Sequence, residues 1–144
     1  MMATKSNTWE LARQWLGAYT MSAPTFLPDE IVRDLRPSVD NSGWQYIPGF
    51  WSAGDSNIWS YIQERLPGGL TGSVLLITDQ CFSPNRCPFL VDVERIEPLV
   101  SSFVDDHGDE MFGGDWLLIH PDALIMVHHE GMYCVVSNVV PASG

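Results

Sequence analysis

The sequence predicts an α+β domain with a largely antiparallel sheet of about five strands and with helices packed on one face of that sheet. Apolar residues recur at helical spacing in the first half of the chain and again after residue 95. Short apolar runs bounded by turn residues predict a β-hairpin over 73–93 and a C-terminal meander over 115–137. The 144 residues have the length of one globular domain, 1–144, and not of two.

The first two helices are predicted from their start signals and apolar spacing. Asn7 or Thr8 can cap the first helix, in which apolar residues recur through 12–19. The second helix covers 29–35, because a proline opens it and Pro37 stops it. We expect the tryptophans of the first helix to face the core.

The segment 37–54 is predicted to be a long ordered loop, because it contains two prolines and three glycines. Such loops often carry function, and this one is rich in aromatic residues: Trp44, Tyr46, Phe50 and Trp51. Asp55 or Ser56 can then cap a third helix, which ends at the Pro-Gly-Gly sequence of 67–69.

The rest of the chain alternates strands with one helix. Strands are predicted at 73–78 and 89–93, with 79–88 as a long hairpin connection. Apolar residues at 96, 99, 100, 103 and 104 follow the helical repeat closely, and Gly108 marks the end of that helix. Three further strands, 116–120, 124–129 and 132–137, are joined by short turns.

The charge of the chain limits its partners. With 18 acidic and 7 basic residues, the formal net charge is −11. Such a field repels nucleic acid and anionic membranes and attracts a basic protein from a distance. After Arg95 there is no lysine or arginine, whereas these acidic residues follow: Glu97, Asp105, Asp106, Asp109, Glu110, Asp115, Asp122 and Glu130.

The sequence also predicts a soluble, cytoplasmic protein. Its longest apolar runs have the length of a strand and not of a membrane span, and its N-terminus lacks the charged and apolar regions of a signal sequence. The three cysteines, Cys81, Cys87 and Cys134, cannot all pair within one chain, which favours reduced thiols.

His128, His129 and Glu130 are the densest group of residues that could bind a metal. Further candidates lie nearby in the sequence: His107, Asp115 and His120. Because successive residues of a strand point to opposite faces, His128 and His129 should not reach one ion together. A structural or interface role is therefore favoured over a metal site, and no cofactor is expected.

Two other motifs are read as structural. A cysteine nucleophile paired with one of the strand histidines would be conceivable, but no catalytic signature accompanies Cys81, Cys87 or Cys134, and buried free cysteine is common. Gly113-Gly114 does not have the setting of a phosphate-binding loop. We expect it to be a turn that needs positive φ.

The acidic segment 105–115 is predicted to bind a partner, because charged residues there neighbour apolar residues expected to be exposed, including Trp116. The aromatic segment 44–51 is an alternative contact. The predicted partner-binding residues are Asp105, Asp106, Asp109, Glu110, Met111, Phe112, Asp115, Trp44 and Trp51.

The sequence Met-Phe-Gly-Gly-Asp-Trp-Leu-Leu-Ile-His at 111–120, together with Val-His-His-Glu-Gly-Met-Tyr at 127–133, resembles small bacterial immunity proteins of polymorphic-toxin systems. The resemblance implies a cytoplasmic inhibitor that occludes a basic cognate toxin, such as a nuclease, without catalysing a reaction. Two alternatives stay open. One is a small metal- or cysteine-dependent enzyme using His120, His128, His129 and Glu130, and the other is a DNA mimic.

Overall fold

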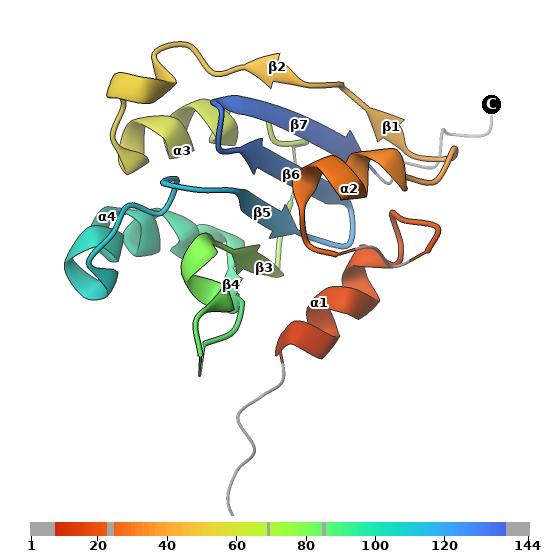
Figure 1. Cartoon of the computed structure of the whole chain (residues 1–144), viewed down its shortest axis with the longest axis horizontal. Coiled ribbons are helices and arrows are strands. Elements are labelled where there is room, and N and C mark those ends of the chain that lie inside the picture. Colours follow the sequence, from red (N-terminus) through yellow and green to blue (C-terminus); the bar gives the residue numbers. More distant parts are fainter. Residues whose placement is uncertain (1–7, 23–24, 69, 85, 138–144) are drawn as a thin grey trace, which may run out of the picture.

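A seven-stranded sheet runs through the residues that the computed structural model describes, which are 8–22, 25–68, 70–84 and 86–137 (Figure 1). Every strand pairing in it is antiparallel. The strand order is β1-β7-β6-β5-β3-β4, and β2 also pairs with β7. The predicted α+β class is therefore confirmed.

The strands include the predicted hairpin and the predicted meander, and two short strands add to them. The bounds are β1 Asp40–Asn41, β2 Gln45–Tyr46, β3 Ser73–Ile77, β4 Phe89–Asp92, β5 Trp116–Ile119, β6 Ala123–His128 and β7 Met132–Ser137. The helices are α1 Thr8–Leu16, α2 Pro28–Arg33, α3 Asp55–Gln63 and α4 Ile96–His107, with 3-10 turns η1 Phe50–Ser52, η2 Asp79–Phe82 and η3 Val93–Arg95. None of the helices in the described part of the chain is long and apolar enough to cross a membrane.

Helices cover both faces of the sheet, so the expectation of helices on one face is wrong. Along β3, Val74 and Leu76 belong to one buried cluster with α3 and α4, whereas Leu75 and Ile77 belong to another with α1 and α2. Figure 1 shows the two helix pairs on opposite sides of the sheet. The reason is the continuous apolar sequence of β3, β5 and β6, since a strand that is apolar on both faces must be covered on both.

The segment 37–54 is more regular than the predicted loop, because two parts of it pair with β7. Gln45 lies opposite Tyr133 in the register, and the Tyr133 hydroxyl donates a hydrogen bond of 2.8 Å to Gln45 Oε1. The Ile47 N–H then donates to the Gly131 carbonyl at 2.8 Å. These contacts hold η1 beside the β6–β7 turn.

The helix α4 follows its sequence prediction and leads directly into the acidic segment. Ile96, Val100 and Phe103 are its buried residues, and Gly108 ends it with a φ of 78°. The residues from 109 to 115 then return the chain to β5. Met111 and Phe112 of this segment lie beside the first turn of α3.

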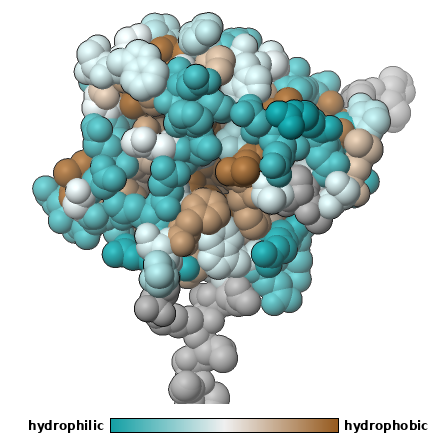
Figure 2. Space-filling view, in the orientation of Figure 1, coloured by the Kyte–Doolittle hydropathy of each residue, from teal (hydrophilic) through white to brown (hydrophobic). Residues whose placement is uncertain are grey.

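The face shown in Figure 2 is mostly hydrophilic, with apolar residues gathered near its middle. Three aromatic rings from α1, η2 and the segment before α2 meet on the α1/α2 side of the sheet. The Trp9 ring lies 5.1 Å from that of Phe26 and 5.0 Å from that of Phe82. A hollow of about 150 Å³ lies beside them and is lined by Phe26, Leu27, Ile77, Asp79, Phe82, Asp115 and Leu117.

Candidate protein-binding surface

Asp55 fixes the position of the acidic segment. It is the first residue of α3 and not its cap, because Gly54 occupies the capping position. Its buried carboxylate accepts hydrogen bonds from the N–H of Met111 at 2.7 Å and from the N–H of Phe112 at 3.2 Å. Hydrogen bonds to an ionised acceptor are the strong ones, so Asp55 ties a loop far along the chain to the start of a helix.

Met111 and Phe112 face inward as a result, so the expectation that they are exposed for a partner is wrong. Met111 is 1% exposed and Phe112 is 3% exposed. Phe112 packs on Trp116, with ring centroids 4.9 Å apart, and Trp116 is itself fully buried. These three side chains complete the core on the α3/α4 side, and the segment presents the carboxylates of Asp109 and Glu110 to solvent.

The exposed aromatic residues come from the segment before α3. Tyr46 is 75% exposed and Trp51 is 78% exposed. Gly49 has a φ of 67°, a conformation that suits glycine, and η1 begins directly after it. Phe50 is buried while Trp51 points outward, with their rings in an edge-on contact of 5.2 Å. Trp and Tyr are enriched among the residues that dominate protein interfaces, so Trp51 and Tyr46 are candidates for contact with a partner.

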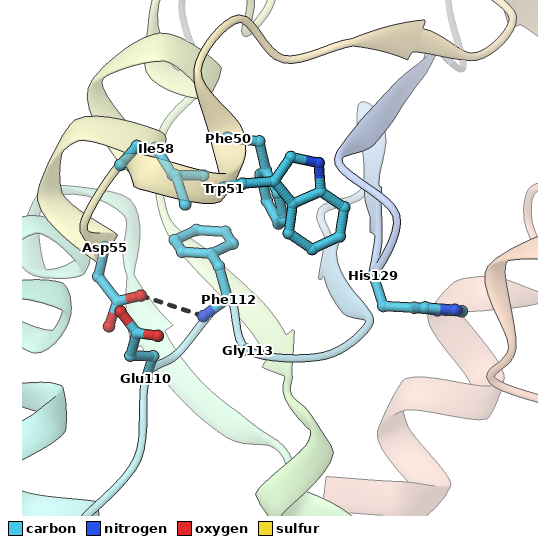
Figure 3. A pocket seen from close by; sticks show the side chains of 9 residues that line it. Phe50, Trp51, Asp55, Ile58, Glu110, Phe112, Gly113 and His129 are labelled. Carbon is cyan, nitrogen blue, oxygen red and sulfur yellow. Dashed lines mark hydrogen bonds between the residues drawn. The ribbon is translucent and has the colours of Figure 1, made fainter.

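Phe50 and Trp51 line both of two adjoining hollows. The smaller has a volume of about 170 Å³, and Asp55, Glu110 and His129 contribute to its lining (Figure 3). The larger has about 550 Å³ and includes Tyr46 and Glu130 in its lining. None of the described residues that line either hollow is a lysine or an arginine. We name this region the Trp51 surface, defined by Tyr46, Trp51, Glu110, His129 and Glu130.

The structure separates the other predicted partner-binding residues. Asp105 and Asp106 are exposed in the last turn of α4 and do not line the hollows. Asp115 is half-buried, and its Oδ1 accepts hydrogen bonds from both the backbone N–H and the ring Nδ1 of His129, each at 2.9 Å. Trp44 is also half-buried and places its ring 5.6 Å from that of His128.

His120, directly after β5, and His128, the last residue of β6, make the same pattern of hydrogen bonds. The Nδ1 of His120 accepts a hydrogen bond from the Asp122 N–H at 3.0 Å, and the Nδ1 of His128 accepts one from the Glu130 N–H at 3.1 Å. Each Nε2 can then donate, from His120 to the Thr71 carbonyl at 2.8 Å and from His128 to an Asp29 carboxylate oxygen at 3.2 Å. Both histidines thus stabilise the turns that follow β5 and β6.

His128 and His129 do not point to opposite faces, which corrects the expectation from strand alternation. Because β6 ends at His128, His129 lies in the turn and its ring stacks on that of His128 at 4.2 Å. The hydrogen bond to Asp115 raises the pKa of His129 above its ordinary value. Burial raises the pKa of Asp79, and the negative charge of Asp115 adds to this effect, whereas a hydrogen bond from the Asp115 backbone opposes it.

The cysteines are free and are not paired with a histidine in the hydrogen bonds described. Cys81 contacts Thr78, and the Cys134 thiol donates to Asn41 Oδ1. Burial raises the pKa of Cys81 and raises that of Cys134 to about 11. A thiol that stays protonated is a poor nucleophile, so these two residues fit the structural interpretation.

Gly114 is required by a close approach and not by positive φ. The described glycines with positive φ are Gly43, Gly49, Gly72, Gly108 and Gly131, so the expectation for Gly113 and Gly114 is wrong. A Cβ on Gly114 would lie 1.7 Å from Asp79 Oδ2, whereas a Cβ on Gly113 would lie 3.3 Å from its nearest neighbour.

Gly114→Ala should therefore lower the free energy of unfolding by about 1–3 kcal/mol, as overpacking usually does. We expect Asp79→Ala in the same chain to recover most of this loss, because it removes the clashing carboxylate. Gly113→Ala is the matched control and should cost much less. Urea denaturation measures the free energy of unfolding of Gly114→Ala, Asp79→Ala, Gly113→Ala and the Gly114→Ala/Asp79→Ala double variant. A loss in Gly114→Ala that Asp79→Ala does not relieve would contradict this explanation.

Asp55 was not among the residues predicted to form the site, and Tyr46 was included only as part of the alternative contact segment 44–51. Asp55 lies 56 residues before Met111, and no pattern in the sequence joins them. Tyr46 could have been named individually, because an aromatic residue in a polar, glycine-containing segment is a candidate for exposure. Taken together, fold and site define an acidic α+β protein with an exposed aromatic anchor between carboxylate-lined hollows. Comparisons with protein-family models, curated proteins and solved structures gave no match to the chain.

Proposed function

We propose that the chain is an inhibitor that binds a basic protein through the Trp51 surface, in the manner of the toxin-immunity proteins that its sequence resembles. The observation that carries this proposal is Trp51, which is 78% exposed and lines two hollows. The described lining residues of these hollows include the carboxylates of Asp55, Glu110 and Glu130 but no lysine or arginine. An isolated exposed tryptophan needs no explanation, but one set between adjoining hollows resembles the aromatic centre of a protein interface.

The chemistry of the hollows favours an arginine-containing partner. A guanidinium group can stack on the face of Trp51 and form paired hydrogen bonds with the Glu110 carboxylate at the smaller hollow. On the other side of Trp51, Glu130 can receive a second cationic side chain at the larger hollow. The arginines and lysines that a nuclease uses to hold its substrate have this chemistry, so their capture blocks the toxin without any reaction by this chain.

The remaining acidic residues have a different part in the proposal. Asp105, Asp106 and Asp109 are exposed. They lie shortly before Glu110 of the Trp51 surface in the sequence, but they do not line its hollows. Charges around an interface mainly raise the association rate at low salt. We therefore assign them to steering and assign Trp51 to the stability of the bound complex.

The test uses the basic effector domain expected beside the gene for this chain. Co-expression should give a 1:1 complex and protect cells from the effector. Trp51→Ala should raise the dissociation constant at least about 30-fold, the effect of losing a 2 kcal/mol hot spot. Neutralising Asp105, Asp106 and Asp109 together should slow association at least about tenfold at low salt and flatten its salt dependence.

Phe82→Ala is the matched control, because Phe82 is also an exposed aromatic residue but lies outside the Trp51 surface. It should leave the dissociation constant unchanged. A gene neighbourhood without a basic effector, or full protection by the Trp51→Ala variant, would overturn the proposal.

A further inference from the structure

We propose that Asp115, His128 and His129 form a binding site for a divalent cation of the zinc type. Each residue offers one ligand atom, and these atoms all lie within 4.8 Å of one another. Ligands bound to zinc at about 2.0–2.2 Å are typically about 3–4 Å apart, so small side-chain movements bring this group to coordination distance. The site goes beyond the proposed function, because neither the Trp51 surface nor inhibition requires a metal.

The local structure already gathers the three residues. The β6–β7 turn stacks the ring of His129 on that of His128, with an angle of 26° between their planes. Asp115 reaches this turn from the residue before β5 and accepts the backbone N–H of His129 at 2.9 Å. The main chain that carries two of the ligands is therefore hydrogen-bonded to the side chain that supplies the third.

Carboxylates around the site suit a bound cation. An oxygen of Asp29 lies 3.2 Å from Nε2 of His128, and an oxygen of Glu130 lies 3.7 Å from its Nδ1. Asp79 is close enough to Asp115 that their negative charges interact. Histidines that bind metals commonly place their second nitrogen against a carboxylate, and an excess of negative charge favours a divalent ion.

Binding through Nε2 replaces both hydrogen bonds that the His128 ring makes in the metal-free chain. Its Nε2 now donates towards Asp29 because its Nδ1 accepts the Glu130 N–H. An ion on Nε2 takes the place of that hydrogen, and the imidazole then carries its proton on Nδ1. Because a protonated Nδ1 cannot accept, the Glu130 N–H loses this partner, and Nδ1 can donate instead to the Glu130 carboxylate, which has an oxygen 3.7 Å away. Asp29 stays beside the ion as a counter-charge. This change of tautomer releases no net proton from His128.

The cluster is reachable from solvent. The side chain of His129 is 57% exposed and lines the smaller hollow beside Trp51. Asp115 is 25% exposed and lines the separate hollow of about 150 Å³ beside η2, on the α1/α2 side of the sheet. Nitrogen ligands favour zinc, nickel and copper, whereas magnesium and calcium prefer oxygen. We therefore expect zinc to bind and magnesium not to bind at comparable concentration.

Calorimetric titration of zinc chloride into metal-free protein without a histidine tag tests the site. We expect saturation at one ion per chain. His129→Gln and Asp115→Asn should each weaken binding at least about tenfold, because even the loss of a group that only supports a ligand typically costs about 10–100-fold in metal affinity. His129 is the primary variant because its exposed side chain can be replaced without opening the core, which is not true of buried His128.

Two controls separate this site from general attraction to an acidic protein. His107→Gln removes a histidine at the end of α4, and Asp105→Asn removes an exposed carboxylate, and neither should change zinc affinity. Cobalt in place of zinc gives an independent readout, because its visible absorption reports nitrogen coordination, and this absorption should disappear in His129→Gln. The proposal is overturned if the unmodified protein shows no saturable zinc binding, or if His129→Gln binds zinc equally well. Because the measurement uses no partner protein, its failure leaves the proposed inhibitor function unaffected.

Discussion

Trp116→Ala is expected to lower the free energy of unfolding by about 3–5 kcal/mol, the usual cost of removing a large buried aromatic side chain. Trp116 is fully buried and packs against Phe112 and Trp59 at ring separations of 4.9 and 6.2 Å. The alanine variant leaves a cavity in the cluster that joins β5 to α3 and α4. Urea or thermal denaturation followed by circular dichroism measures the change.

Two variants make this expectation specific. Trp116→Phe should cost much less, because it keeps most of the buried ring and removes an indole N–H that has no hydrogen-bond partner among the described residues. Trp51→Ala should change stability by no more than about 0.5 kcal/mol, since Trp51 is exposed. Equal losses of stability in Trp51→Ala and Trp116→Ala would contradict the burial of Trp116 and the exposure of Trp51.

Asp55→Ala is expected to cost about 3 kcal/mol, because it removes a charged acceptor and leaves two backbone N–H groups without it in a buried position. Those groups belong to Met111 and Phe112, so the loss should also free the segment between α4 and β5. Hydrogen exchange should therefore show faster exchange of the Met111 and Phe112 amides. Asp55→Asn, which retains one acceptor oxygen, should have an intermediate effect.

Glu110→Ala is the control for Asp55→Ala, because it removes an exposed carboxylate from the same segment. It should change the free energy of unfolding by about 0.5 kcal/mol or less. If Asp55→Ala were no more destabilising than Glu110→Ala, the two hydrogen bonds would not be what holds the segment in place.

The helices and strands lie where the sequence predicts them when a single strong pattern determines their position. The helix α4 has a strict apolar repeat and a glycine at its end, and β7 lies where its apolar residues predicted it. The two-sided burial of the sheet was also present in the sequence, because β5 and the run from Ala123 to Val127 have no polar alternation. The expectation that helices cover one face did not take this pattern into account.

The short strands β1 and β2 could not be predicted in the same way. Each has two residues, too few for a periodic pattern, and their partner β7 lies far along the chain. Similarly, His129 was expected to point away from His128 because the strand was predicted to run one residue too far. A boundary error of one residue changes which side chains meet, because alternation holds only inside the strand.

The sequence by itself determined the α+β class, the order of the main helices and strands, and an acidic surface in the last third of the chain, since local periodicity and net charge are properties of neighbouring residues. Only the tertiary structure decided which apolar residues are exposed. Asp55 turns Met111 and Phe112 into the core, while η1 leaves Trp51 outside it. It also brought Asp115 to His128 and His129. Contacts between distant segments depend on how the whole chain packs, and no local pattern encodes them.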